Sequence, residues 1–246
     1  MPGFIKKITA PNCMKQTVNT FIFSDVHLGS PLSRPSLLLG SLQEYNFKRL
    51  ILLGDVFEDI NFKKLPDMHW ELLKYLNNLM KNSEIEIVWI RGNHDEMLDK
   101  ISSIFLGIEI LDEYKWVING KNFLVMHGHQ FDRFFKSNWL FVKFLSLGYH
   151  TVAKMDTKKR AILNFLKRKS NIWFKVSEDL KQGAVNYAAK SNTDIVICGH
   201  SHYPCNENME INGKKIMYYN SGCWVEHPGI FITITEKAEV ITHYIY

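Results

Sequence analysis

The sequence is poor in cysteine and contains no CxxC pair. Its 246 residues include four cysteines, at positions 13, 198, 205 and 223. A chain of this length can build a core that needs no disulfide staples, so we expect reduced thiols and a cytoplasmic protein. The absence of a cysteine cluster also excludes the usual kind of structural zinc site.

Long apolar runs and repeats are also absent. No run approaches the ~20 apolar residues that cross a bilayer. The first residues, MPGFIKKITAPNC, lack the apolar core of a secretory signal. No tandem repeat is found. The composition, with 46% hydrophobic and 22% charged residues, is that of an ordinary globular protein. We therefore expect a single domain over residues 1–246.

Positive charge is concentrated in one part of the chain. The net charge is +5, yet the stretch from Arg133 to Lys181 holds twelve Lys or Arg against three acids. The rest of the chain is therefore slightly acidic, at −4. Residues 131–190 are aromatic and basic, with helical patterns and no strand rhythm. They predict a helical insert within the domain.

The first half of the chain alternates between strand and helix patterns. Apolar runs within 19–29, 49–59 and 85–95 are typical of buried strands. Residues 66–82 predict a helix, with apolar side chains at helical spacing: Trp70, Leu73, Leu76 and Met80. This alternation favours βαβ units with largely parallel pairing.

The second half favours antiparallel strands. Residues 114–129 and 209–222 each predict a hairpin, because an Asn-Gly pair separates two strand patterns. Residues 194–202 contain another buried strand, and two more close the chain. The prediction is an α/β fold of two packed mixed β-sheets flanked by helices.

Five polar clusters follow predicted strands. In chain order they are Asp25-Val26-His27, Gly54-Asp55, Gly92-Asn93-His94-Asp95, His127-Gly128-His129 and Gly199-His200-Ser201-His202. Side chains at i and i+2 of an extended chain share a face, so the D-x-H and H-x-H pairs are each expected to aim two ligands at one place. The adjacent glycines are expected to allow sharp turns and close approach.

The residue types in these clusters point to a divalent metal. Carboxylates, imidazoles and an amide oxygen suit Mn²⁺, Fe²⁺ or Zn²⁺, and the carboxyl ends of parallel strands form a shared crevice. One such cluster alone is more often a turn or a strand-end hydrogen-bond pair. Five in order, each after a strand, favour a metal site.

The order D-x-H, GD, GNH(D/E), H and GHxH resembles that of the calcineurin-like metallophosphoesterases. The resemblance implies a hydrolase of phosphoric esters or anhydrides with two divalent metal ions. One ion would be held by Asp25, His27, Asp55 and His202, and the other by Asp55, Asn93, His127 and His200, so that Asp55 bridges them. Mn²⁺ is the ion we expect, with Fe²⁺ and Zn²⁺ as alternatives.

The resemblance also assigns a catalytic residue. It places His94 beside the scissile phosphate, as proton donor or phosphate stabiliser. Such a histidine needs an orienting partner, and Glu58 and Asp95 are both candidates. Three further residues have two interpretations each. Arg91 is a phosphate or a surface contact, and His129 and Asn220 are substrate contacts or turn residues.

The fuller strings SDVHLGS, GDVFED, GNHDE, HGHQFD, CGHSHYP and YYNSGCWVE look most like the bacterial branch around UDP-2,3-diacylglucosamine pyrophosphatase. That branch acts on a lipid-linked nucleotide in lipid A synthesis and carries a helical insert over the acyl chains. Residues 131–190 would then be a lid, and residues 134–175 would associate with the inner membrane surface. The alternative is an ordinary helical hairpin packed on its own domain.

Two departures from this branch leave the substrate open. The best-known members have Arg where this chain has His94, and Asp where it has His129. A phosphodiesterase or phosphatase acting on nucleotides, small diesters or phosphoproteins is the alternative. A nucleic-acid substrate and an obligate protein partner are not expected. A non-enzymatic scaffold is disfavoured because the ligand set is complete.

Overall fold

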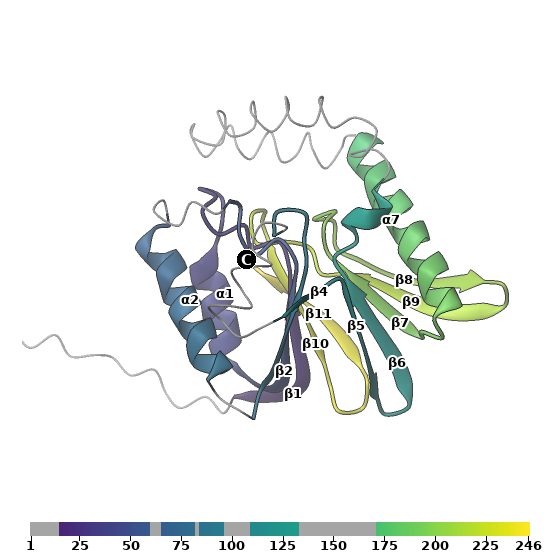
Figure 1. The fold of residues 1–246 in the computed structure, drawn as a ribbon, viewed down its shortest axis with the longest axis horizontal. Helices are drawn as coiled ribbons and strands as arrows, with labels where there is room; N and C mark the ends of the chain where they lie inside the picture. Colours follow the sequence, from purple (N-terminus) through teal and green to yellow (C-terminus); the bar gives the residue numbers. More distant parts are fainter. Residues whose placement is uncertain (1–14, 60–64, 82–83, 96–108, 133–170) are drawn as a thin grey trace, which may run out of the picture.

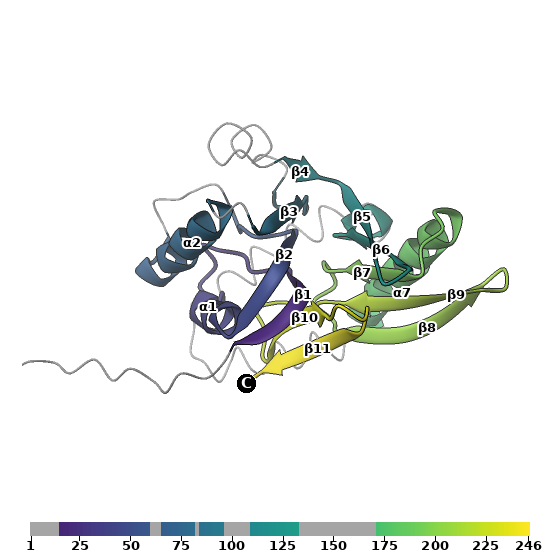
Figure 2. The same ribbon diagram turned by 90° about the horizontal axis from the view of Figure 1, so that it is seen from below.

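The computed structural model describes residues 15–59, 65–81, 84–95, 109–132 and 171–246. Two β-sheets pack face to face, and helices cover their outer faces (Figures 1 and 2). Each sheet contains both parallel and antiparallel pairs. The predicted α/β architecture of two mixed sheets with flanking helices is therefore confirmed.

The first sheet has the strand order β11-β10-β1-β2-β3-β4. Four strands run parallel: β1 (Gln16–Phe23), β2 (Tyr45–Leu53), β3 (Glu86–Ile90) and β4 (Ile110–Leu111). β10 (Gly229–Ile234) pairs antiparallel with β1, and β11 (Val240–Ile245) pairs antiparallel with β10. β11 therefore runs in the same direction as β1.

Two helices cover the outer face of the first sheet (Figure 1): α1 (Pro35–Gln43) and α2 (Asp67–Met80). α1 was not predicted from the sequence. In α2, Leu72 and Leu76 are buried, whereas Trp70 is 41% exposed. The prediction that Trp70 belongs to the apolar stripe is therefore wrong, because the buried face is set by the i,i+4 leucine pair.

The second sheet has the strand order β5-β6-β7-β9-β8. Its strands are β5 (Glu113–Ile118), β6 (Lys121–Met126), β7 (Ile195–Cys198), β8 (Cys205–Ile211) and β9 (Lys214–Asn220). Both predicted hairpins are present. Asn119-Gly120 and Asn212-Gly213 all have positive φ, between 48° and 77°, as a type I′ turn requires.

The sheets share an apolar core. Ile22, Ile51 and Ile90 of the first sheet pack with Val125 and Ile197 of the second. Successive residues of a strand point to opposite faces, so a strand covered on both faces reads as a continuous apolar run. This explains why the predicted strands showed no alternation.

Helix α7 (Asn171–Lys190) covers the outer face of the second sheet. Its buried Leu180, Ala184 and Val185 pack in the same cluster as Leu124 and Val196 of the sheet. α7 lies within the stretch predicted as an insert. Residues 133–170, which hold most of the predicted insert and of the 134–175 stretch expected at a membrane surface, lie outside the described residues, so the insert and its role as a lid remain predictions.

Within the described ranges, no helix combines the length and the apolar character that crossing a membrane requires.

Candidate metal centre

The predicted ligand clusters lie at the carboxyl ends of parallel strands from both sheets. Asp25 follows β1 and Asp55 follows β2, while His127 follows β6 and His200 follows β7. Main-chain hydrogen bonds join these ends: Gly199 N donates to His127 O at 3.0 Å, and Asp25 N donates to Gly54 O at 3.0 Å. Four strand ends from two sheets therefore converge at one edge of the fold.

Five of the predicted ligands have a left-handed backbone. Their φ angles lie between 49° and 65°, at Asp25, His27, Asp55, His200 and His202. Residues other than glycine rarely adopt this conformation, and each instance costs about 1–3 kcal/mol. The prediction of an extended D-x-H pair is therefore wrong: the chain turns sharply at each ligand, and that turn aims the side chain.

These turns bring the ligands into three overlapping groups. In each group the candidate ligand atoms lie within 4.8 Å of one another. The groups are Asp25, His27 and His202; His27, Asp55 and His94; and Asp55, His127 and His200. The first and third belong to the two ligand sets that the resemblance implied, and Asp55 lies between them.

Acidic and imidazole groups meet closely in this centre. Asp25 Oδ1 lies 3.2 Å from His202 Nε2, and Asp55 Oδ2 lies 3.4 Å from His127 Nε2 and 3.8 Å from His27 Nε2. All five side chains are at least 85% buried. Two carboxylates and three imidazoles are thus held almost out of water in one place.

The histidines are oriented by carboxylates on the ring nitrogen that points away from the centre. His27 Nδ1 lies 2.9 Å from Glu58 Oε2, and His200 Nε2 lies 3.0 Å from Asp132 Oδ2. Such partners fix the tautomer and the ring orientation of metal-binding histidines. Asp132 was not singled out in the sequence, although it closes the quoted string HGHQFD.

Of the other two histidines, one has a main-chain partner and the other lies near a carboxylate. His127 Nδ1 lies 2.8 Å from Leu53 O, so that Nε2 faces the centre. His202 Nδ1 lies 3.9 Å from Glu226 Oε1, which closes the string YYNSGCWVE. Glu226, only 4% exposed, was also missed, because nothing in its local sequence marks a partner 24 residues away.

His94 is oriented by a main-chain atom. Its Nδ1 lies 2.9 Å from the carbonyl oxygen of Glu58, and its backbone N–H donates to Asp55 Oδ1 at 2.9 Å. The carboxylate of Asp95 accepts hydrogen bonds from the backbone N–H groups of Asp55 and Gly92, at 2.8 and 3.1 Å. The sequence offered the carboxylates of Glu58 and Asp95 as the orienting partner of His94. In the structure the partner is the main-chain carbonyl oxygen of Glu58.

The other predicted site residues are Asn93, His129 and Arg91, and the structure places them around the ligand groups. Asn93 is exposed beside His94. The ring of His129 is 5.5 Å from that of His127. Arg91 forms an ion pair with Asp112 at 3.1 Å, which favours its interpretation as a surface contact.

Asn220 supports the loops beneath the ligands. It is fully buried; its Nδ2 donates to Gly199 O at 2.6 Å, and its Oδ1 accepts from Gly222 N–H at 3.0 Å. Beside it, the hydroxyls of Ser24 and Ser221 are 2.7 Å apart and join the two sheets. Asn220 therefore holds the chain that carries His200 and His202.

Two glycines make room for the carboxylates. A Cβ at Gly92 would lie 2.1 Å from Asp55 Oδ1, and one at Gly199 would lie 2.7 Å from Asp25 Oδ2. Both distances are shorter than any real contact. The ligands can occupy their positions only because these two residues lack a side chain.

Charge interactions outweigh burial at Asp25 and at His127. Burial alone would raise the pKa of Asp25, but the charges of His127 and His202 hold it at about 2. Burial would lower the pKa of His127, but Asp55 and Asp25 raise it to about 9. The pKa of Asp95 is raised to about 6 by burial and by the charge of Asp55. The centre therefore binds positive charge strongly, whether as protons or as cations.

The donor atoms fit divalent cations. Within the described part of the chain, Nε2 of His27 and Nε2 of His127 are buried and form no hydrogen bond. Buried polar atoms without a partner are costly. Both atoms face Asp55, so a cation placed among these groups would satisfy them together.

Comparisons with known proteins agree with this geometry. A sequence model of the family described as calcineurin-like phosphoesterase matches residues 18–204. UDP-2,3-diacylglucosamine hydrolase of Blochmanniella pennsylvanica is 26% identical, over 89% of this chain and 93% of its own length. The hydrolase of the same name from Photorhabdus laumondii is 25% identical, over 89% and 96%.

A solved structure described as a novel archaeal phosphodiesterase resembles this fold with a TM-score of 0.51. The match covers 92% of this chain and 99% of that one, at 19% sequence identity. At this identity the likeness establishes the fold alone.

Proposed function

The chain belongs to the calcineurin-like phosphoesterase family, and from this premise we propose that it hydrolyses a phosphoric ester or anhydride with two divalent cations. One observation carries the proposal. The groups Asp25, His27 and His202, and Asp55, His127 and His200, lie side by side, and Asp55 also lies within 4.8 Å of His27 and His94.

Each group would hold one cation. Asp25, His27 and His202 would hold the first and His127 and His200 the second, with Asp55 shared and Asn93 completing the second set. Bound there, the cations would supply Lewis acidity to a phosphoryl group and lower the pKa of an attacking water. We propose Mn²⁺ as the native ion, with Fe²⁺ and Zn²⁺ as alternatives, because carboxylate, imidazole and amide donors suit all three.

His94 is proposed to act on the substrate. A carbonyl oxygen can only accept a hydrogen bond, so the contact with Glu58 O places a proton on Nδ1 of His94. Nε2 is then available to the substrate. The ring is exposed, and its centroid lies 4.9 Å from that of His27. This position suits a group that protonates the leaving oxygen or stabilises the phosphate.

The substrate that we propose is UDP-2,3-diacylglucosamine, cleaved at its pyrophosphate to release UMP, in the lipid A pathway. Support comes from relatives of that name, which match about nine-tenths of both chains at 22–27% identity. The six quoted sequence strings add to it. We also propose that the protein works in the cytoplasm, at the inner membrane surface, where a lipid-linked nucleotide is found.

One observation favours a second candidate. His94 occupies the rim of the centre, where the best-known members of that branch have Arg. A phosphodiesterase or phosphatase acting on nucleotides, small diesters or phosphoproteins would use a histidine there.

A substrate panel tests both. The Mn²⁺-loaded protein would be assayed with UDP-2,3-diacylglucosamine, bis-p-nitrophenyl phosphate and p-nitrophenyl phosphate, with and without a chelator. We expect chelator-sensitive release of UMP that exceeds turnover of the aryl esters. Turnover of the aryl esters alone would contradict the lipid-nucleotide substrate and favour the phosphodiesterase or phosphatase. Failure to turn over all three would contradict the hydrolase.

A further inference from the structure

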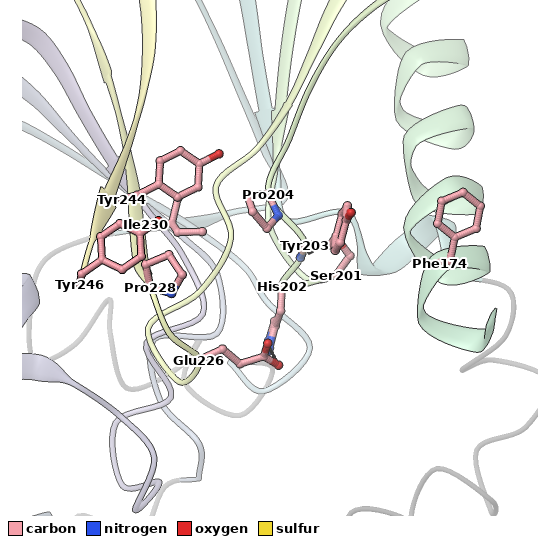
Figure 3. A pocket seen from close by; sticks show the side chains of 10 residues that line it. All are labelled: Phe174, Ser201, His202, Tyr203, Pro204, Glu226, Pro228, Ile230, Tyr244 and Tyr246. Carbon is pink, nitrogen blue, oxygen red and sulfur yellow. Dashed lines mark hydrogen bonds and ion pairs between the residues drawn. The ribbon is translucent and has the colours of Figure 1, made fainter. Parts of the chain in front are cut away.

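A pocket of about 280 Å³ opens beside the candidate metal centre and shares only His202 with the proposed ligand sets. His202 lies at its inner end, next to Glu226 (Figure 3). Aromatic and proline side chains line the pocket. Figure 3 shows Pro204 toward Pro228, Tyr244 and Tyr246, and Tyr203 on the side of Pro204 that is turned toward Phe174. The pocket therefore extends from a candidate metal ligand to a wall of rings.

The fold explains why rings gather there. β11 runs in the same direction as β1, so Tyr244, near the end of β11, lies at the edge of the sheet where the metal ligands follow β1. Tyr203 and Pro204 follow His202 directly in the loop that leads into β8. The two walls come from different sheets, and the metal centre lies between them.

The rings that line the pocket are open to solvent. Tyr203 is 51% and Tyr244 48% exposed, and Tyr246 is 85% exposed. These rings are not buried in the apolar core, and exposing their apolar faces to water does not stabilise the fold. Exposed aromatic faces next to a phosphate-binding centre are the usual platform for a nucleobase, because every base presents a flat face that stacks on a ring.

We propose that this pocket holds the base of a nucleotide whose phosphate lies at the metal centre. The inference rests on the proposed function in one respect, that the centre binds the phosphate. A nucleotide is part of the first candidate substrate, and nucleotides are one of the substrate classes of the second candidate. The base would lie against Tyr203 and Tyr244, and the ribose would pass His202.

An acyl chain fits the pocket less well. Methylene groups would gain from burial but could not use the three tyrosine hydroxyls or the Glu226 carboxylate at the inner end. A base can stack on the rings and also form hydrogen bonds with these groups. The polar inner end and the flat walls therefore favour the base.

The test uses two ligands that differ only in the base. UMP and ribose 5-phosphate would be titrated calorimetrically into the metal-loaded protein, its Tyr203→Leu and Tyr244→Leu variants, and a Tyr244→Phe variant that keeps the ring. Tyr187→Leu is the matched control, because Tyr187 is a similarly exposed tyrosine, 39% exposed, on α7 outside the pocket. Hydrolysis of methyl p-nitrophenyl phosphate, which has no base, would be measured in parallel.

We expect UMP to bind at least about tenfold more tightly than ribose 5-phosphate, and each Leu variant to lose about fivefold or more of that preference. Tyr244→Phe and Tyr187→Leu should keep it. Equal affinities for the two ligands, or a preference that survives both Leu substitutions, would overturn the inference. Turnover of the baseless ester reports on the proposed function separately. If every variant hydrolyses it while the base preference is absent, the pocket assignment fails and the hydrolase stands.

Discussion

Nε2 of His200 lies 3.0 Å from Oδ2 of Asp132, a carboxylate that is 1% exposed. This contact fixes one ring nitrogen of His200 and turns the other toward Asp55 and His127. Asp132 lies at the start of the predicted insert, 131–190, and is the last described residue before position 133. The root of that segment therefore contributes directly to the orientation of a candidate metal ligand.

Replacing Asp132 should weaken one of the two metal sites. In Asp132→Asn the imidazole of His200 loses its charged partner, and we expect binding of one Mn²⁺ equivalent to weaken about 10–100-fold. Calorimetric titration of the chelator-treated protein would measure both equivalents. Asp112→Asn is the control, since the Asp112 side chain is 79% exposed and pairs with Arg91. Two unchanged equivalents in Asp132→Asn would show that this carboxylate does not position a ligand.

A single methyl group at residue 92 should abolish metal binding. In Gly92→Ala the new Cβ meets Asp55 Oδ1 at 2.1 Å, so the shared carboxylate must move. Gly40→Ala is the matched substitution: its Cβ meets nothing within 4 Å, and it lies inside helix α1. We expect Gly40→Ala to keep both metals and to stabilise the fold by about 0.5–1 kcal/mol. Metal titration and thermal unfolding of both variants test this, and full metal content in Gly92→Ala would contradict it.

Substitutions of His94 and His127 should differ in their effects on metal binding. His94→Ala removes a group that we assign to the substrate, so turnover should fall about 10²–10⁴-fold while two metal ions stay bound. His127→Ala removes a ligand, so it should lose metal as well as activity. Metal analysis of the purified variants, beside their rates, distinguishes the two roles. Loss of a metal ion from His94→Ala would reassign His94 as a ligand.

Helix α7 should contribute to stability as a core element. Leu180 is fully buried against the second sheet, so Leu180→Ala should lower the free energy of unfolding by about 2–5 kcal/mol. Val117 on β5 is 61% exposed, and Val117→Ala should change the free energy of unfolding by less than about 0.5 kcal/mol. Chemical denaturation would measure both. An equally small effect of Leu180→Ala would mean that α7 is not part of the domain core.

The sequence by itself determined the strands other than β4, both hairpins and the identity of the candidate ligands. These features depend on neighbours in the chain: β-branched runs make buried strands, and an Asn-Gly pair makes a two-residue turn. The clusters after Phe23, Leu53 and Cys198 are local in the same sense. The family follows from their order, which the sequence alone contains.

Only the tertiary structure decided how these residues are aimed and held. The left-handed turns at Asp25 and Asp55 depend on hydrogen bonds between strand ends. The residue types at these positions do not predict the turns. The partner of His200 is 68 residues away, and the pocket wall at Tyr244 reaches the centre only because β11 runs parallel to β1. Such contacts are set by strand order and sheet packing, which join distant segments, so local sequence patterns do not contain them.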